Sequence, residues 1–428
     1  MTEPADSAEP PLRMGVIVSR YPKVNDMYQL REILELERQG IEVELFPLVH
    51  HNETVSHAEG KRLEERAHFV KLLSLETLKA QIYWLRRNPR AYLRCWWQGL
   101  WSLRKAPEFA VRTLWIVPIA AVWAIKMREI GVDRTHAHFA TYPTHAAMVI
   151  HELAGIPYGF TGHAHDLQVR TVGLADKMAG ADYAMTCTHH GAGLLRAAAG
   201  SKADGKVHVV YHGIELDTYA LRPFRDGDPE DCLRICCVAS FEEYKGHEYL
   251  LAACAGLQQG GVAFELMLLG DGVDRAAIEK MVDDLGIRSS VDFTGKVAST
   301  EVRTWIEWSD VCALASVVAE SGQLDGIPNF LTESMAMGRP IVSTTLPGIK
   351  ELITDGVNGL LVPPRDAHAF AEALLRLRGD ASLRQRLVAA GRAVVEAEHD
   401  VTVNTQECVR VYREAHRRSL GLTRADQA

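Results

Sequence analysis

The stretch SVVAESGQLDGIPNFLTESMAMGRPIVST, residues 316–344, places three acidic side chains around the expected start of a helix. Asp325 and Glu333 are eight positions apart, and the change from a glycine-containing loop to a helix-forming run falls between them. Glu320 lies five residues before Asp325, within the loop. Because an aspartate followed by glycine is also a common turn sequence, the spacing alone leaves open whether Asp325 takes part in chemistry or only in the turn.

The helix that follows this loop offers a site for an anion. Its first backbone N–H groups, near Asn329, Phe330 and Leu331, lack carbonyl partners within the helix, and the helix dipole adds a partial positive charge. A phosphate is a typical ligand of such a helix start. Lys245, in VASFEEYKGHEYL, would add a full positive charge for a phosphate, although a single lysine is more often a solvated surface residue.

Other polar residues also follow expected strands, and in doubly wound folds ligands bind beyond the carboxyl ends of the strands. The segment LLGDG ends a strand with Gly270, Asp271 and Gly272, which is equally typical of a turn without function.

Two pairs of histidines have the spacing of residues on one face of a strand. His163 and His165 lie in TGHAHDL, and His136 and His138 lie in THAHFA. Either pair could supply two ligands to a metal, but no third ligand is predictable, so both pairs stay ambiguous.

Short apolar runs alternate with helix-length amphipathic segments along the whole chain. This alternation predicts an α/β fold with parallel sheets covered by helices on both faces. A helix is expected at 27–40, ending at Gly40. The expected strands are 14–20, 42–48, 135–140, 157–163, 181–188, 207–213, 233–240, 264–272, 291–295, 310–316, 340–344 and 359–364.

The strands fall into two sets separated by a segment rich in charge, proline and glycine, residues 214–232. We therefore expect two Rossmann-like domains, 1–215 and 216–395, followed by a charged helical segment, 396–428. A length of 428 residues also suits two domains better than one core.

The composition excludes several classes of protein. A net charge of -8 argues against a general nucleic-acid binder. The eight cysteines form no CxxC pair, which favours buried thiols in a reducing compartment over disulfides or a zinc site. The N-terminus has no apolar signal-peptide core, and the longest apolar run, 114–125, is too short to span a bilayer and contains Pro118. A cytoplasmic location is expected.

Residues 82–112 differ in composition from the alternating strands and helices around them, because they combine seven cations with a single acid, Glu108. Six of the eight tryptophans lie between residues 84 and 123. A basic, tryptophan-rich helix is typical of a surface that contacts anionic lipid, with Arg94, Trp96 and Trp97 as candidate contacts for the membrane or for an acceptor. The alternative is a helical insertion near 82–129 that packs its tryptophans into the first domain.

The ordered motifs together resemble retaining glycosyltransferase family 4, which has the GT-B architecture of two Rossmann-like domains facing a cleft. The resemblance covers most of the chain and is most specific in its second half. It is closest in kind to bacterial exopolysaccharide enzymes of the colanic-acid type. It rests on YPKVNDMYQLREILEL, FTGHAHDL, VYHGIELDTY, VASFEEYKGHEYLLAA, LLGDG, VDFTGKV, and residues 316–344 continued through GIKELITDGVNGLLVPPRD.

The resemblance implies a role for individual residues. Glu333 would hold the ribose hydroxyls of a nucleotide-diphosphate sugar, and Asp325 would bind hydroxyls of the donor sugar. Lys245 would bind the diphosphate, and His163 would contact the sugar near the reaction centre. The loop Lys23–Asp26 would lie near the phosphates and the acceptor, and the last helix would return to the first domain. Further donor contacts are expected at Asn25, Ser240, Gly270, Asp271, Gly272, Gly326, Asn329, Phe330 and Leu331.

Three positions differ from the family pattern. Asp325 stands where a longer glutamate is usual, and Ser240 stands where an arginine commonly joins the lysine on the diphosphate. VNDM replaces the more usual Ser-Glu-Thr of the early loop. Lys296 is a candidate for the missing cation, although the sequence does not place it.

The resemblance therefore implies a metal-independent transferase that moves a sugar to a lipid-linked or growing polysaccharide, with peripheral contact to the inner face of the plasma membrane. The alternatives are a nucleotide-sugar epimerase on the same fold and a non-catalytic sugar-binding relic. A Rossmann dehydrogenase is disfavoured, since residues 14–30 contain only Gly15 of the expected G-x-G-x-x-G.

Overall fold

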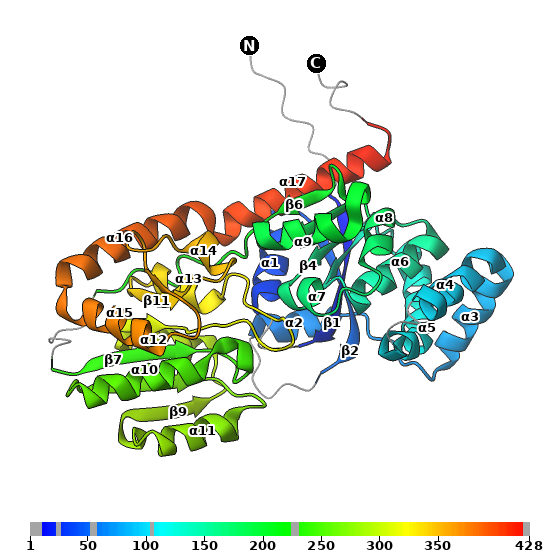
Figure 1. The fold of residues 1–428 in the computed structure, drawn as a ribbon. Coiled ribbons are helices and arrows are strands. Elements are labelled where there is room, and N and C mark those ends of the chain that lie inside the picture. Colours follow the sequence, from blue (N-terminus) through cyan, green and yellow to red (C-terminus); the bar gives the residue numbers. More distant parts are fainter. Residues whose placement is uncertain (1–10, 23–26, 52–57, 103–106, 224–230, 423–428) are drawn as a thin grey trace, which may run out of the picture.

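The computed structural model describes residues 11–22, 27–51, 58–102, 107–223 and 231–422, which form two parallel six-stranded sheets with helices packed around them (Figure 1). Each of the twelve strands expected from the sequence is present among the described residues, which confirms the α/β class. The strands are shorter than expected at several carboxyl ends. There the chain turns into the loops that carry the polar residues.

The first sheet has the strand order β2-β1-β3-β4-β5-β6, with every neighbouring pair parallel. Its four central strands are almost wholly buried, because helices cover both faces, whereas the edge strand β6 is half-buried. The strands are Arg13–Tyr21 (β1), Glu42–His50 (β2), Arg134–His138 (β3), Tyr158–Gly162 (β4), Tyr183–Thr186 (β5) and Val207–Val209 (β6). The helices are Met27–Arg38 (α1), Ala58–Arg66 (α2), Leu75–Arg87 (α3), Pro89–Ser102 (α4), Pro107–Glu129 (α5), Tyr142–Ala154 (α6), Ala164–Gln168 (α7), Leu174–Gly180 (α8) and His189–Ala199 (α9).

The second sheet has the order β12-β11-β10-β7-β8-β9, so the strand order reverses between β7 and β10. In open α/β sheets, ligands bind outside the carboxyl ends of the strands at such a reversal. The strands are Leu233–Val238 (β7), Phe264–Leu269 (β8), Val291–Gly295 (β9), Val311–Ala313 (β10), Ile341–Thr344 (β11) and Leu360–Val362 (β12). The helices are His247–Gln259 (α10), Arg275–Asp284 (α11), Ser299–Trp308 (α12), Asn329–Ala336 (α13), Ile349–Leu352 (α14), Ala367–Gly379 (α15) and Ala381–Glu398 (α16).

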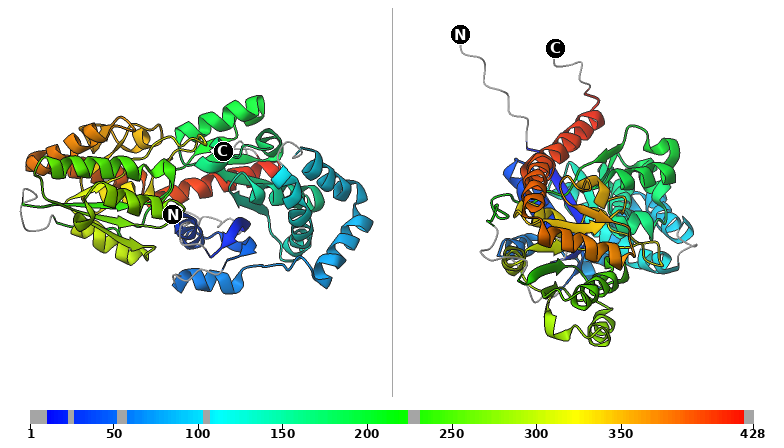
Figure 2. Two further views of the ribbon diagram at one scale, coloured as in Figure 1. Left: turned by 60° about the horizontal axis from the view of Figure 1, so that its bottom comes forward. Right: turned by 60° about the vertical axis from the view of Figure 1, so that its left-hand side comes forward.

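The last helix, Val401–Ser419 (α17), returns to the first sheet (Figures 1 and 2). Its buried residues Cys408, Val411 and Tyr412 share a core with Met14 of β1. The Arg134 guanidinium of β3 donates to the Tyr412 carbonyl at 3.0 Å. The helix therefore joins the second half of the chain to the first through packing as well as connectivity.

Helices α3 and α4 project from the end of the first half that lies farthest from the second sheet (Figures 1 and 2). They pack against α5, which runs unbroken through Pro118 for 23 residues and is long and apolar enough to cross a membrane. The sequence predicted that this apolar run is too short to cross a bilayer, and that prediction of its length is wrong. In the apolar window of α5, 61% of the residues are buried inside the protein, which is typical of a core helix.

Candidate functional site

A cavity of about 640 Å³ opens where the strand order of the second sheet reverses. It lies at the carboxyl ends of β7 and β8 and at the start of α13, as expected for a doubly wound sheet. One wall carries Arg31, from α1 of the first half, so the cavity lies between the two halves. Seven residues expected from the sequence line it: Ser240, Lys245, Gly270, Asp271, Asn329, Phe330 and Glu333.

Lys245 and Asp325 form a buried ion pair at the edge of this cavity. Lys245 ends a 3₁₀ turn after β7, and its Nζ lies 2.5 Å from Asp325 Oδ1. The hydroxyl of Ser316, which follows β10, donates to the other Asp325 oxygen at 2.6 Å. Burial lowers the pKa of Lys245, but the Asp325 carboxylate outweighs it, so the pKa is raised and the lysine stays cationic. The shorter aspartate is thus held rigidly beside the cation.

The start of α13 forms the opposite wall. Asn329 and Phe330 line the cavity at the first turn, and Pro328 precedes the helix in an extended conformation. The sequence expectation is wrong for Leu331, because its N–H donates to the Pro328 carbonyl at 3.0 Å and its side chain is fully buried. Two N–H groups, those of Asn329 and Phe330, therefore remain as candidates for binding an anion.

The glycine turn after β8 brings backbone close to the neighbouring strand end. Gly270 has a φ of 144°, and a Cβ there would lie 1.9 Å from the Ala239 carbonyl oxygen. A Cβ on Gly272 would lie 2.3 Å from the Phe241 carbonyl oxygen. Glycine is therefore required at both positions by packing, and Gly272 itself does not line the cavity, unlike Gly270 and Asp271.

His163 is the first residue beyond β4 and caps the short helix α7. One of its ring nitrogens accepts the backbone N–H of Asp166, whose carboxylate accepts the His163 N–H in return at 2.8 Å. The other ring nitrogen of a neutral imidazole then carries the proton, so it can donate to an oxygen of a ligand. The expectation that His163 and His165 share one face of a strand is wrong, because α7 begins between them and His165 is exposed.

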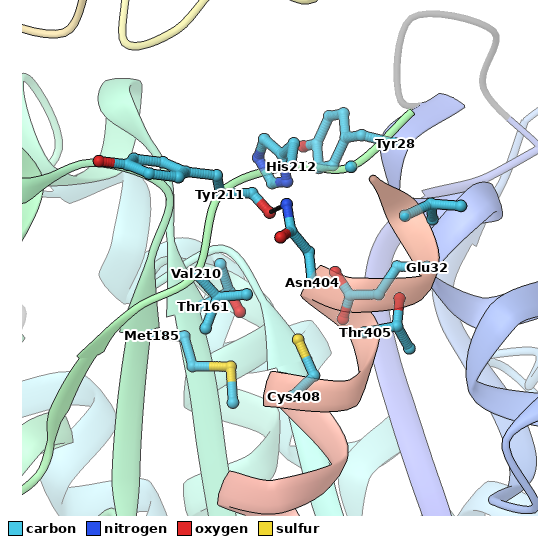
Figure 3. Close-up of a pocket in the computed structure, with 12 residues that line it drawn as sticks. Tyr28, Glu32, Thr161, Met185, Val210, Tyr211, His212, Asn404, Thr405 and Cys408 are labelled. Atoms are coloured by element: carbon cyan, nitrogen blue, oxygen red, sulfur yellow. Dashed lines mark hydrogen bonds between the residues drawn. The ribbon is translucent and has the colours of Figure 1, made fainter. Parts of the chain in front are cut away.

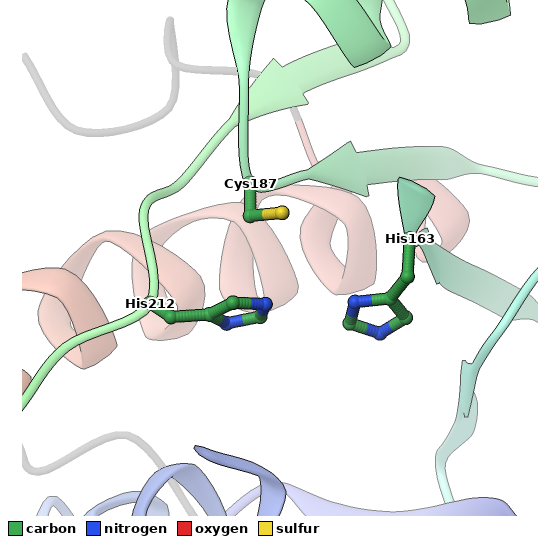
Figure 4. Close-up of side chains that lie close together, drawn as sticks. All are labelled: His163, Cys187 and His212. Carbon is green, nitrogen blue, oxygen red and sulfur yellow. The ribbon is translucent and has the colours of Figure 1, made fainter. Parts of the chain in front are cut away.

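Figure 4 shows His163, Cys187 and His212 grouped at the ends of three neighbouring segments of the first half. Their potential ligand atoms lie within 4.8 Å of one another. A metal would require His163 to present a lone pair, whereas its hydrogen bond to Asp166 leaves the proton on the nitrogen that is not bonded there. The arrangement favours a hydrogen-bonding role for His163.

His136 and His138, the other pair noted in the sequence, both belong to β3 and lie near Glu32. Both ring nitrogens of His136 are already bonded, to the Tyr183 hydroxyl at 3.1 Å and to the Thr161 hydroxyl at 3.0 Å. His136 therefore has a structural role in the core, and a metal bound to either of its ring nitrogens would have to displace one of these hydroxyl contacts.

The loop between β10 and α13 contacts helix α7 of the first half. The Leu324 N–H donates to the Gln168 side chain at 2.9 Å, and His165 Nδ1 lies 3.1 Å from the Gln323 side-chain oxygen. Gly326 faces Cys187, since a Cβ on this glycine would lie 3.9 Å from the thiol sulfur. The contacts bring the loop carrying Asp325 beside the His163 cluster, although neither Gly326 nor His163 lines the cavity itself.

Sequence reasoning missed Arg31, Tyr219 and Tyr28. The Arg31 Nη2 donates to Glu333 Oε1 at 3.0 Å and to the Tyr219 hydroxyl at 2.8 Å. Tyr28 packs its ring against His163, with centroids 5.1 Å apart. An arginine within an amphipathic helix pattern gives no signal that it will reach a carboxylate 302 residues later.

Other expected residues lie away from the cavity or outside the described part of the chain. Asn25 and the loop Lys23–Asp26 lie outside the described residues. Arg94 pairs with Glu152 at 2.7 Å, Trp96 is half-buried against the core, and Trp97 is 61% exposed. Lys296, the candidate for the cation missing at Ser240, lines the cavity and is exposed.

A second, much smaller cavity of about 20 Å³ lies between α1, β4 and α17 and is large enough for one water molecule (Figure 3). Glu32 lines it, and the Tyr412 hydroxyl donates to Glu32 Oε1 at 3.3 Å. Burial raises the pKa of Glu32 to about 7, and burial lowers the pKa of the neighbouring His138 to about 3. Both groups are therefore neutral in the folded protein at mildly acidic pH.

Replacing Glu32 with glutamine is expected to remove part of the pH dependence of stability. In the unfolded chain Glu32 ionises near its ordinary pKa of 4.5, whereas in the folded protein it holds its proton to about pH 7. The wild type therefore loses up to about 3 kcal/mol of unfolding free energy as the pH rises from 4.5 to above 7, and Glu32→Gln does not. Denaturant titrations at pH 5 and pH 8 measure this. An equal difference between the variant and the wild type at both pH values would contradict the assignment.

Comparison with known proteins agrees with this geometry. The family "Glycosyl transferases group 1" matches residues 232–380, the segment that contains Lys245, Asp325 and Glu333. The amylovoran biosynthesis glycosyltransferase AmsK of Erwinia amylovora is 37% identical over 194 residues, which are 45% of this chain and 47% of that protein. The putative colanic acid biosynthesis glycosyltransferase WcaL of Escherichia coli is 35% identical over 169 residues, 40% of this chain and 41% of that protein. The matched segment thus spans about half the length of these relatives.

Solved structures resemble the chain over almost its whole length. Anabaena HepE in complex with UDP and glucose superimposes with a TM-score of 0.68 at 16% sequence identity, covering 94% of this chain and 99% of that one. Both sheets and their covering helices are included in this likeness, which confirms the architecture expected from the sequence. The chain therefore has the GT-B fold, and its residues 232–380 match the family glycosyl transferases group 1.

Proposed function

We propose that the protein is a retaining glycosyltransferase of family 4, which moves a sugar from a nucleoside-diphosphate sugar to a lipid-linked or growing exopolysaccharide. The observation that carries the proposal is the cavity at the strand-order reversal, where Lys245, the start of α13 and Glu333 meet. The names of the relatives that act in amylovoran and colanic acid biosynthesis support the acceptor class. The complex of HepE with UDP and glucose supports the donor class.

In this proposal the site acts mainly on the charge of the leaving group. As the bond between the sugar and the diphosphate breaks, negative charge grows on the phosphate oxygens. Lys245 and the first N–H groups of α13 stabilise that charge, an effect that is strongest where water is excluded. Glu333 holds the ribose, and Asp325 and His163 bind the sugar.

The anomeric configuration is retained if the acceptor attacks the sugar from the face that the leaving phosphate occupies. The phosphate then accepts the proton of the acceptor hydroxyl while the new glycosidic bond forms, so no carboxylate nucleophile is needed. Because Lys245 and the α13 N–H groups supply the charge compensation, we expect transfer to proceed without a divalent cation.

A screen of UDP-, GDP- and ADP-sugars, followed by product analysis with a lipid-linked glycan acceptor in EDTA, tests the function. The expected result is thermal stabilisation by one nucleotide class and transfer with retained anomeric configuration. Epimerised donor in place of transferred sugar would assign the alternative enzyme on this fold. Activity that is lost in EDTA and restored by Mg²⁺ would refute metal independence, and binding without turnover would point to a sugar-binding relic.

We also propose that the protein works at the cytoplasmic face of a membrane, with α3 and α4 as its contact. Among the described residues, twelve of the twenty exposed large apolar side chains belong to residues 73–114. Trp97 and Trp101 are 61% and 52% exposed, and their rings stack with centroids 4.9 Å apart. Exposed Lys79, Arg86 and Arg87 border the apolar residues of α3 and would bind anionic headgroups.

Replacing both Trp97 and Trp101 with serine is expected to lower binding to anionic liposomes by roughly tenfold or more, since each large apolar ring that leaves water contributes about 1.5–3 kcal/mol. Flotation with phosphatidylglycerol-containing vesicles measures the change. The matched control replaces Leu420 and Leu422, which are similarly exposed just beyond the end of α17, with serine and should leave binding unchanged. If the wild-type protein does not float with these vesicles, the proposed membrane contact of α3 and α4 is refuted.

A further inference from the structure

Arg31 connects the first half of the protein to the donor cavity in the second half. It belongs to α1, yet its side chain is only 6% exposed because it lies against Tyr219 and Glu333. Its guanidinium carbon lies 5.1 Å from the centre of the Tyr219 ring, so the ring also contributes a cation–π contact. Burial lowers the pKa of Arg31, but the Glu333 carboxylate raises it by more, so the pKa of Arg31 is raised overall and the charge persists.

Only one of the two terminal nitrogens of this guanidinium forms hydrogen bonds with the described residues. Nη2 donates to both Glu333 and Tyr219, while the buried Nη1 has no hydrogen-bond partner among the described residues. A buried, charged N–H donor without an acceptor lowers the stability of the folded protein. Because this donor belongs to a residue that lines a cavity, a ligand in the cavity could supply the missing acceptor. Arg31 lines the cavity of about 640 Å³, which is open to a ligand.

The remaining cations do not suffice for a diphosphate. Lys245 is already neutralised by Asp325 at 2.5 Å, and Ser240 contributes no charge. Lys296 lines the cavity but is exposed, where a single ion pair is worth little. A buried arginine, with a planar fork of donors, is better suited to hold phosphate oxygens.

We propose that Arg31 is the second cation of the donor site, and that its Nη1 binds a phosphate oxygen of the nucleoside diphosphate while its Nη2 keeps Glu333 and Tyr219 in place. This inference rests on the proposed function. The site would then be complete only when the two halves of the protein are together, since one phosphate contact comes from each half.

Isothermal calorimetry with a nucleoside diphosphate and with its parent nucleoside tests the assignment. The nucleotide is the one of UDP, GDP and ADP that binds the wild type best. Arg31→Met is expected to lower the affinity for the diphosphate by roughly 10- to 100-fold more than the affinity for the nucleoside, which depends on Arg31 only through Glu333. The matched control is Arg303→Met, since Arg303 also faces the Tyr219 ring but does not line the cavity; it should leave both affinities unchanged.

Equal losses for the diphosphate and the nucleoside would overturn the inference, because they would mean that Arg31 acts only by holding Glu333. An unchanged affinity for the diphosphate would overturn it as well. If Arg31→Met does not fold, Arg31→Lys carries the test, since lysine lacks the planar fork with which the guanidinium presents one nitrogen to Glu333 and another to a phosphate; a selective loss of diphosphate affinity supports the inference and its absence overturns it. A wild type that binds none of the three diphosphates would instead overturn the proposed function, and this inference with it.

Discussion

Replacing Glu333 with glutamine lowers the affinity for the donor nucleotide by roughly 10- to 100-fold, as expected for losing a charged hydrogen-bond acceptor of the ribose hydroxyls. Glu333 is 8% exposed and lines the cavity of about 640 Å³. The amide keeps the shape of the side chain but accepts hydrogen bonds through one oxygen only. It also leaves the buried Arg31 without its carboxylate, at 3.0 Å in the wild type, so the binding wall loses rigidity as well as charge.

Titration of the nucleotide by calorimetry measures this effect, with thermal unfolding as a check that the variant is folded. The matched control is Glu320→Gln in the loop before α13. Glu320 is exposed, and its backbone N–H bonds to Glu243 at 2.9 Å, so its side chain has no expected contact with the donor. The assignment of Glu333 to the ribose is refuted if the variant binds the nucleotide as the wild type does.

Replacing Lys245 with methionine is expected to lower the rate of transfer by roughly 10²- to 10³-fold, because in the proposed site the leaving diphosphate loses a cation that stabilises its charge. The same change leaves Asp325 buried without a partner, since Lys245 Nζ lies 2.5 Å from it in the wild type. Breaking a buried pair by removing one partner costs about 3–5 kcal/mol, so the variant is also expected to be less stable. Single-turnover transfer and denaturant unfolding measure the two effects separately.

A surface pair provides the comparison. Lys280 and Asp284 are also 2.5 Å apart, but the lysine is 73% exposed, so Lys280→Met should cost less than about 1 kcal/mol and leave transfer unchanged. The double variant Lys245→Met with Asp325→Asn removes the unpaired charge and should recover stability without recovering the rate. Recovery of transfer in this double variant would exclude an electrostatic role for Lys245.

The elements of the fold could be predicted because their signals are local. Each buried strand is a short apolar run, and Gly40 ends α1 with a φ of 80°, as its position in the sequence indicates. The local sequence predicted the wrong element limits where contacts between distant parts of the chain determine them. α5 continues through Pro118 because neighbouring helices bury it, and α7 begins directly after β4, which separates His163 from His165. The domain limits and the roles of the site residues stay predictions.

The sequence by itself placed Lys245 after a strand of the second sheet and Asp325 and Glu333 around the start of a helix, because strand ends and a helix start are fixed by residues close together in the chain. It also put Glu320 outside that pair. Only the tertiary structure decided that Asp325 is held by Lys245 and Ser316, and that Glu333 is held by Arg31. Those contacts join residues up to 302 positions apart, and no local pattern encodes which side chains two separate sheets bring face to face.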